Sequence, residues 1–237
     1  MNKIFYFIFI FLNFNLFAEE STFTKAEEYF KKGKLEMALV FYNKTLEREP
    51  DNIQALFNRG RIHLYNKDYV SAISDLKKVL DISLKRTDVY YYLGCSYAGK
   101  GDAESAIDAF LKVPSNDKNY VSVFLNLGNI YLGMLKDKEK TIENWEKFLN
   151  LKPSDEQAEK IREAIKCLKD PQCWESVLAE LNNNSLSSTN SSSTNVSSDT
   201  NKIILPDFIM PDIKGEGTKA DVSKQKNIED KKSIRTE

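Results

Sequence analysis

Three glycines recur at an interval of 34 residues, and this period constrains the fold more than any other feature of the sequence. Gly60, Gly94 and Gly128 each lie in a segment rich in leucine and aromatic residues. The same interval relates three alanines and three large apolar residues: Ala38, Ala72 and Ala106, then Tyr42, Leu76 and Phe110. Self-similarity at this period is typical of repeat proteins, in which each unit packs on its neighbours.

The spacing inside each unit predicts a pair of short amphipathic helices. In the best-preserved unit, Tyr90, Gly94 and Tyr97 follow the i, i+4, i+7 pattern of one helical face. A glycine on that face lets the partner helix approach closely, and an alanine in the second helix has the reciprocal effect. Gly33 and Gly101 mark turns between the two helices, where a positive φ is least costly for glycine. One such hairpin cannot bury its apolar face alone, so the units must stack.

This pattern resembles the tetratricopeptide repeat family, whose signature is Trp-x2-Leu-Gly-x2-Tyr followed by Ala-x3-Phe and Pro. The resemblance implies an all-α, right-handed solenoid of helix hairpins. Four repeats are expected over 19–155, with the boundaries 19–52, 53–86, 87–120 and 121–155. The fourth unit is displaced by a one-residue insertion near Lys136, so that Thr141, Trp145 and Pro153 take the equivalent places.

Residues 156–182 continue the helical rhythm without the consensus and are expected to form a degenerate fifth unit that caps the solenoid. Ser154 is predicted to cap the first of these helices, with Gln157 completing a capping box. Asp170 and Pro171 are predicted to begin the second helix. A charged outer face suits a terminal repeat, which must remain soluble.

Two cysteines flank the turn of this last hairpin. Cys167 ends the first helix and Cys173 begins the second. Such positions can approach the separation of about 5.5–6 Å between Cα atoms that a disulfide requires. A disulfide and a pair of buried thiols both remain open, and oxidation requires export from the cytoplasm.

The N-terminal residues 1–18 have the layout of a secretory signal peptide. Lys3 precedes a continuous apolar run, and Ala18 precedes an acidic pair. The apolar run is shorter than the ~20 residues that span a bilayer. We expect an exported, periplasmic protein. Retention of residues 1–18 as an inner-membrane anchor is the alternative, because Leu16 is not the small residue that a cleavage site prefers.

The C-terminal tail differs in composition from the repeats. Residues 183–201 are nearly all Ser, Thr and Asn and are predicted to be a disordered linker. The remaining tail, 202–237, contains an apolar island at 203–213 with two prolines, which disfavour a continuous helix. Its candidate binding residues are Leu205, Phe208, Ile209, Met210 and Ile213. The island is expected either to bind another protein in extended form or to pack back on the solenoid.

The composition offers little material for catalysis. The 237 residues include one His and three Cys, and the formal net charge is −1. His63 stands where the repeat family has Tyr and is expected to be a packed residue. We therefore predict no catalytic residue, metal site or cofactor, and no small-molecule substrate. The balanced charge also argues against nucleic acid as a partner.

The resemblance implies that the first helices of the repeats line a concave groove that binds a protein partner, as an extended peptide or a helix. By register, the groove candidates are Phe23, Phe57, Asn58, Arg61, Tyr91, Tyr92, Leu125, Asn126 and Asn129. The apolar members form a file of one residue per repeat, which could equally be core between repeats. The family's carboxylate-clamp pattern is absent, because only Asn58 matches it.

These features predict a non-enzymatic scaffold or adaptor of the cell envelope that binds a partner segment in the groove. Outer-membrane, cell-wall and periplasmic flagellar assemblies are the settings that the resemblance suggests. The alternative is a spacer or self-association module whose tail motif, 203–213, is the binding element. Membrane contact is expected only if residues 1–18 are retained.

Overall fold

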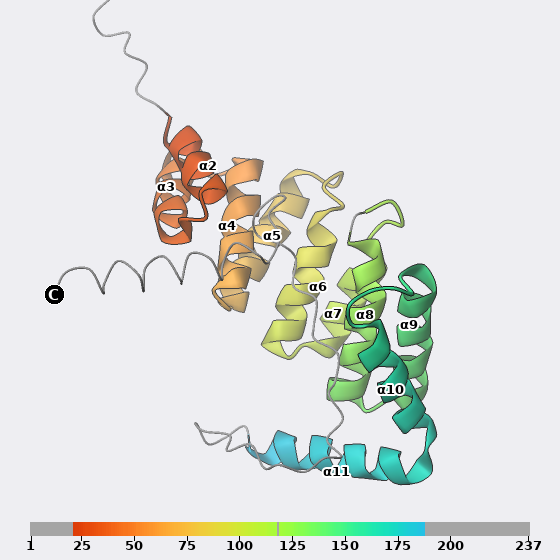
Figure 1. The fold of residues 1–237 in the computed structure, drawn as a ribbon. Helices are drawn as coiled ribbons and strands as arrows, with labels where there is room; N and C mark the ends of the chain where they lie inside the picture. The colour runs from red at the N-terminus through yellow and green to blue at the C-terminus, as the bar shows by residue number, and fades with distance from the viewer. Residues whose placement is uncertain (1–20, 118, 188–237) are drawn as a thin grey trace, which may run out of the picture.

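A computed structural model describes residues 21–117 and 119–187, which are helical throughout apart from turns and short connections. The signal segment and the tail motif predicted above lie outside these residues. The described residues form ten α-helices and one π-helical turn (Figure 1): α2 Thr22–Lys31, α3 Leu35–Arg48, α4 Ile53–Tyr65, α5 Tyr69–Ile82, α6 Val89–Lys100, α7 Ala103–Leu111, α8 Tyr120–Ile130, η1 Tyr131–Leu135, α9 Lys138–Leu151, α10 Ala158–Lys169 and α11 Pro171–Ser187.

The helices form antiparallel hairpins that stack into a curved solenoid, as Figure 1 shows. The hairpins are α2–α3, α4–α5, α6–α7, α8–α9 and α10–α11. The first helices α4 and α6 also pack directly on each other, whereas no two second helices in the described part of the chain make a comparable contact. Helices on the inner side of a curved stack lie closer together. The first helices therefore line the concave side, and the predicted all-α solenoid is confirmed.

Three of the hairpins close where a large side chain of the second helix lies against a glycine of the first. Phe110 lies against Gly94, Trp145 against Gly128 and Leu76 against Gly60. Phe110 and Trp145 are among the largest fully buried side chains of the described residues. The periodic glycines thus act through the space that they leave for a ring or a leucine on the facing helix.

The turns inside the four hairpins share one backbone conformation at equivalent positions. Gly33, Lys67, Gly101 and Lys136 all have positive φ, between 55° and 87°. The sequence revealed this feature only where the residue was glycine. The fourth repeat has one residue more than the others before Lys136, and this extra residue falls at η1. A π-helical turn accommodates one extra residue in a helix. The predicted insertion near Lys136 is therefore absorbed inside the first helix of the fourth hairpin.

The second helices of three hairpins begin with an aspartate cap that the sequence analysis did not single out. Asp68, Asp102 and Asp137 each accept a hydrogen bond from the backbone N–H three residues later, at 2.9–3.2 Å. Hydrogen bonds hold the pKa of both carboxyls below the ordinary value: first from the side chain and then from the backbone N–H of Ser71 for Asp68, and first from the backbone N–H and then from the side chain of Ser105 for Asp102. The caps satisfy N–H groups that a helix start leaves without a partner.

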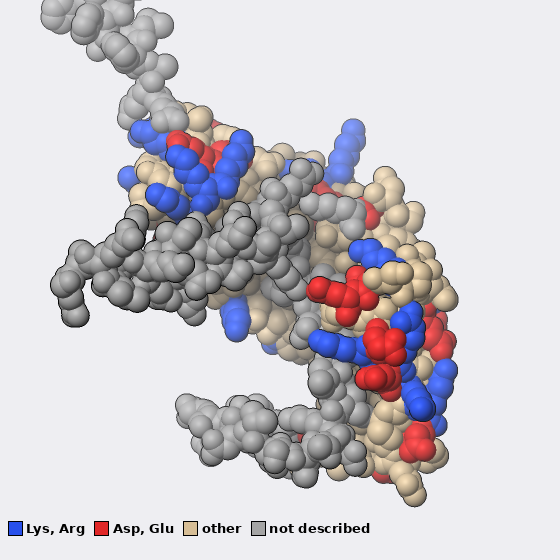
Figure 2. Space-filling model, viewed as in Figure 1, with Lys and Arg blue, Asp and Glu red and all other residues tan. Residues whose placement is uncertain are grey.

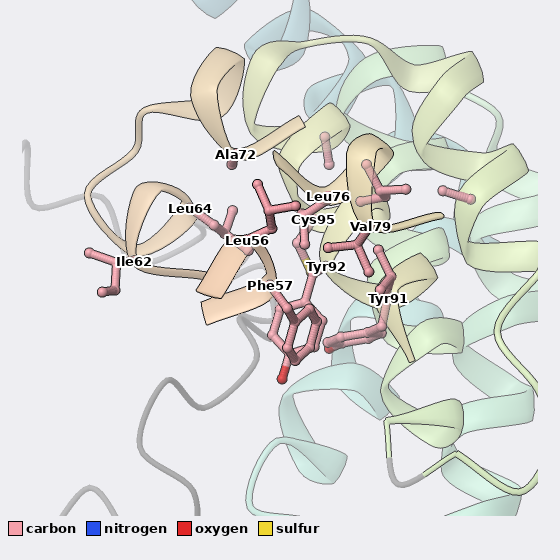
Figure 3. Packing of buried hydrophobic residues seen from close by; sticks show 14 of the residues in the cluster. Leu56, Phe57, Ile62, Leu64, Ala72, Leu76, Val79, Tyr91, Tyr92 and Cys95 are labelled. Atoms are coloured by element: carbon pink, nitrogen blue, oxygen red, sulfur yellow. The ribbon is translucent and has the colours of Figure 1, made fainter. Parts of the chain in front are cut away.

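The core of the solenoid, whose surface Figure 2 shows in space-filling form, consists of two buried clusters. One buried cluster extends from α2 to α8 and is drawn in part in Figure 3. A second cluster joins α8 and α9 to α10 and α11, with Trp145 and Phe148 fully buried at its centre. The last hairpin is therefore packed on the repeats through a shared apolar interface.

Two details of the last hairpin differ from the sequence prediction. The predicted cap at Ser154 is wrong: residues 153–157 form turns, and α10 begins at Ala158 after Gln157, whose side chain makes no capping bond. The backbone N–H of Gln157 instead binds the Asp155 carboxylate at 3.0 Å. The helix α11 continues to Ser187, beyond the predicted end at residue 182, because the Asn/Ser sequence after Leu181 extends an already nucleated helix.

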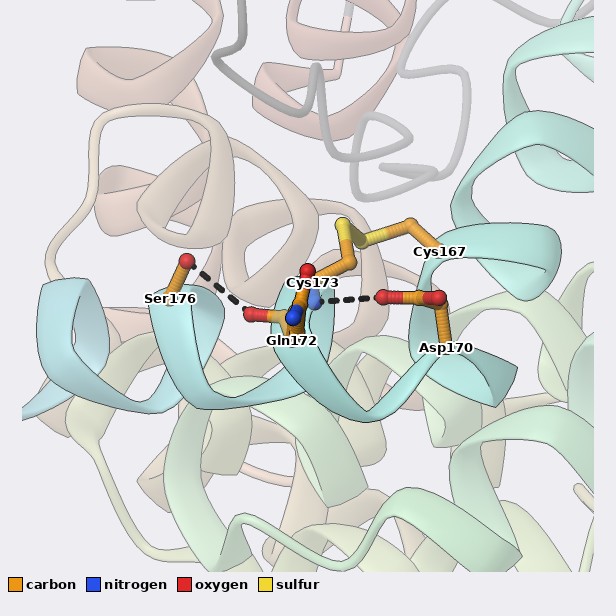
Figure 4. Close-up of a disulfide and its surroundings, with 5 residues drawn as sticks. All are labelled: Cys167, Asp170, Gln172, Cys173 and Ser176. Carbon is orange, nitrogen blue, oxygen red and sulfur yellow. Dashed lines mark hydrogen bonds between the residues drawn. A yellow bond between two sulfur atoms is a disulfide. The ribbon is translucent and has the colours of Figure 1, made fainter.

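A disulfide joins the two helices of the last hairpin, between Cys167 and Cys173 (Figure 4). Their Cα atoms lie 5.3 Å apart. Asp170 caps α11 by accepting a hydrogen bond of 2.8 Å from the N–H of Cys173, and Pro171 is the first residue of the helix. The turn is thus held by a covalent bond and a helix cap together.

The variant Gly94→Ala tests the role of the periodic glycines. A Cβ at position 94 would lie 2.6 Å from Cδ1 and Cε1 of Phe110, so the ring must move and the hairpin must open. We expect a loss of about 1–3 kcal/mol in the free energy of unfolding, measured by urea denaturation. Gly133→Ala is the matched control, because a Cβ at Gly133 meets no atom within 4 Å. Equal stability of both variants would contradict the proposed role.

Replacing both Cys167 and Cys173 by Ser tests the covalent clamp. A loop of about seven residues closed by a disulfide gains roughly 2 kcal/mol from the restricted unfolded state. We therefore expect amide hydrogen exchange in 158–183 to become roughly 30-fold faster, while exchange in α4 and α6 stays unchanged. Unchanged exchange in 158–183 would show that packing on α9 alone holds the hairpin.

Candidate functional site

The candidate site is the concave face of the first helices, and most of its predicted residues are buried there. Phe57 and Tyr92 are 6% and 5% exposed, and Tyr91 and Leu125 are fully buried. The buried polar candidates are Asn58 and Asn126. The aromatic ladder formed by the apolar file could be either exposed or core between repeats, and the burial of Phe57, Tyr91, Tyr92 and Leu125 places these members in the core. The candidates that remain half-buried on this face are Phe23, Arg61 and Asn129.

Arg61 is the centre of this face. Its guanidinium carbon lies 5.1 Å from the ring centroid of Phe30, 5.5 Å from that of Phe57 and 5.3 Å from that of Tyr92. These rings belong to α2, α4 and α6, so one cation on α4 contacts three consecutive repeats. Cation–π contacts of this kind are favourable and hold the guanidinium in place.

The aromatic floor under Arg61 is itself ordered. The rings of Phe57 and Tyr92 meet edge to face with centroids 5.1 Å apart, and Figure 3 shows them side by side with Tyr91 close by. Arg86 lies over the Phe57 ring at 4.5 Å and binds the carboxylate of Asp88 through two hydrogen bonds of 2.9 and 3.0 Å. Two arginines thus border an apolar floor.

A hydrogen-bonded network fixes Arg61 from the side of the first repeat. The Glu27 carboxylate accepts hydrogen bonds from Tyr42 at 2.6 Å and from Asn58 at 2.7 Å. Asn58 in turn accepts one from Arg61 at 3.2 Å. Burial, and secondly the neighbouring Glu27, raises the pKa of Tyr42 far above its ordinary value, so the phenol stays protonated and donates. The network joins side chains of α3, α2 and α4 and fixes the position of the Arg61 guanidinium before any ligand binds.

The fourth repeat contributes two amide side chains to the concave face. Asn126 donates a hydrogen bond of 3.2 Å to the Tyr91 hydroxyl, and Asn129 accepts one of 3.1 Å from the Trp145 indole. Burial raises the pKa of Tyr91 and of Tyr92, which keeps both phenols neutral. Asn129 is half-buried and so brings an amide to the surface of the groove.

The chemically reactive side chains of the described residues have structural surroundings. Cys95 is 1% exposed, and burial raises the pKa of its thiol. His63 packs in α4 with Nδ1 3.2 Å from the carboxylate of Asp68, the cap of the next helix. Within the described residues, no group of three or more His, Cys, Asp or Glu is arranged to hold a metal ion.

Sequence reasoning found the register of the face but missed the role of Glu27, Tyr42 and Arg86. Glu27 and Arg61 occupy equivalent positions of adjacent repeats, and an opposite-charge pair at a face position was the available signal. For Tyr42, only a packing role was predicted from the sequence. The tail candidates lie outside the described residues, so their arrangement stays a prediction.

Comparison with known proteins identifies the repeats. Three stretches match models of the tetratricopeptide repeat, at residues 20–52, 41–74 and 88–119. These three stretches are thus similar to tetratricopeptide repeats, and the described helices form an all-α solenoid of hairpins. Among solved structures, the MamA protein is similar with a TM-score of 0.54 and 22% identity, covering 73% of this chain and 96% of that one. YrrB, a repeat protein with an unusual peptide-binding site, has a TM-score of 0.54 and 16% identity, with 71% and 87% covered.

Curated relatives resemble the chain through part of their length. A TPR repeat-containing protein of Methanocaldococcus jannaschii is 28% identical over 162 residues, 68% of this chain and 26% of that protein. Serine/threonine-protein phosphatase 5 of Rattus norvegicus is 29% identical over 99 residues, 40% of this chain and 20% of that protein. The chain thus spans about a quarter or less of these relatives.

None of the helices in the described part of the chain has both the length and the apolar character needed to cross a membrane.

Tyr91→Ala tests the assignment of the aromatic file to the core. Removing a fully buried ring should cost about 3–5 kcal/mol in the free energy of unfolding and leave Asn126 without its acceptor. The half-buried Phe23 is the matched control, and Phe23→Ala should cost clearly less. The measurement is the urea midpoint of each variant. A Tyr91→Ala protein with native stability would mean that the ring is accessible after all.

Proposed function

We propose that the chain is a non-enzymatic scaffold that binds a segment of a partner protein on its concave face. The observation that carries the proposal is Arg61, a half-buried guanidinium held by three rings and by the Glu27–Tyr42–Asn58 network. A preset cation beside an apolar floor suits an extended peptide or a helix with an acidic side chain next to apolar ones. The peptide-binding site of the structurally similar YrrB supports this use of the fold.

Export to the periplasm, with a role in an envelope assembly, is part of the same proposal. The signal-like residues 1–18 favour it, and so does the Cys167–Cys173 disulfide, since disulfides persist in oxidising compartments. If residues 1–18 are retained, the same scaffold would be held at the inner membrane. Outer-membrane, cell-wall and flagellar assemblies are the candidate settings.

A spacer or self-association module is the second candidate function. The burial of the predicted aromatic ladder favours it, because less apolar surface is left on the concave face for a partner. In that case the binding element would be the tail motif 203–213, and substitutions at Arg61 would leave partner binding intact.

The decisive experiment selects peptides from a random display library on the full chain and measures their affinities by fluorescence anisotropy. We expect an enriched family of apolar peptides that contain Asp or Glu. Arg61→Gln should weaken their binding at least tenfold, as loss of a central arginine contact does. Arg48→Gln is the matched control, because Arg48 is an exposed residue at the end of α3. No enrichment, or equal affinity of both variants, would contradict the groove as the binding site.

A further inference from the structure

The concave face has a chemistry that a segment of the same chain matches. The face combines the apolar floor of Phe57 and Tyr92 with the cation of Arg61. Residues 202–214 read KIILPDFIMPDIK, an apolar run with two carboxylates, Asp207 and Asp212. We propose that this segment docks on the concave face of its own chain, with its apolar side chains against the half-buried residues of that face, such as Phe23, and a carboxylate beside Arg61.

The sequence of the segment suits a groove of this kind. Each aspartate follows a proline, and proline restricts the residue before it to extended backbone. An extended peptide presents apolar and acidic side chains within a few residues of each other. Two carboxylates five residues apart span roughly 16 Å in an extended chain, against about 10 Å between packed helices. One aspartate beside Arg61 would therefore place the other one to two repeats away, towards α6 or α8, where Asn129 offers an amide.

The described chain ends in a suitable place. Figure 1 shows α11 running back beneath the hollow of the solenoid, so the chain that follows Ser187 starts on the concave side. About 14 residues, 188–201, precede Lys202. Their Ser/Thr/Asn composition predicts a flexible tether with a root-mean-square length of roughly 20 Å and a maximum of about 50 Å. Since packed helices lie about 10 Å apart, a tether of this length spans several helices of the solenoid.

The tether also decides between docking in the same chain and docking in a second copy. A short flexible linker gives an effective concentration in the millimolar range. A second copy of the chain at micromolar concentration is about a thousandfold less abundant. Even a weak site is therefore occupied first by the segment of its own chain. Competition between this segment and a partner rests on the proposed function, whereas the docking itself does not.

Site-specific photo-cross-linking of the full chain tests the docking. Benzoylphenylalanine replaces Phe208, a conservative exchange of one aromatic side chain for another, and in a second variant it replaces Val196 as the matched control in the tether. We expect position 208 to cross-link within one chain to peptides of α4 and α6, in at least fivefold higher yield than position 196. Products that join two chains, or equal yields from both positions, would overturn the proposal.

A charge reversal supplies the second arm. Asp207→Lys together with Asp212→Lys should reduce the cross-link at position 208 at least fivefold, because a lysine then replaces the carboxylate beside Arg61, whichever of the two aspartates supplies it. Asp199→Lys, in the tether, is the control and should leave the yield unchanged. An unchanged yield in the double variant would overturn the pairing with Arg61.

The two proposals fail separately. If position 208 cross-links to α4 and α6 but the display library yields no peptide even on the chain with Asp207→Lys and Asp212→Lys, in which the competing segment is released, the docking stands and the partner-binding function falls. If peptides are selected and position 208 shows no such cross-link, the docking is wrong and the partner-binding function stands. If both hold, the double charge reversal should also tighten binding of the selected peptides, because their competitor has been removed.

Discussion

The close contact of a large side chain with a glycine across three of the hairpins is the interaction on which the solenoid depends. Phe110 against Gly94 and Trp145 against Gly128 bring the two helices of their hairpins close together, and both rings are fully buried. A hairpin closed in this way still has apolar side chains on its flanks. Those flanks are buried when the next hairpin stacks, so closure inside a unit and stacking between units depend on each other.

The stacking has a consequence for the concave face. Where first helices approach each other on the inner side of the curve, their large side chains fill the interface between repeats. Tyr91 and Leu125 are fully buried by this packing, and Phe57 and Tyr92 are almost fully buried. The surface available to a ligand is therefore set by the residues at its rim, of which Arg61 is the central one.

The Arg61 guanidinium is both partly removed from water and held in one orientation. A buried cation without partners is strongly unfavourable, but three aromatic faces and the amide of Asn58 compensate for lost hydration. The same contacts restrict the side chain to one orientation, so little conformational entropy is lost when an anion binds. A flexible surface lysine would lack this preorganisation.

The sequence by itself determined the helical hairpins, their number and their order, because glycine, alanine and aromatic positions at a fixed period report directly on local packing. It also located the turn that the cysteines bridge. The tertiary structure alone decided which face positions stay accessible. Register places Phe57, Tyr91 and Arg61 on the same side of successive first helices. Whether each side chain is exposed depends on how closely neighbouring repeats pack, and no single residue determines that distance. For the same reason the Glu27–Tyr42–Asn58 network, whose members come from three helices, emerged only in three dimensions.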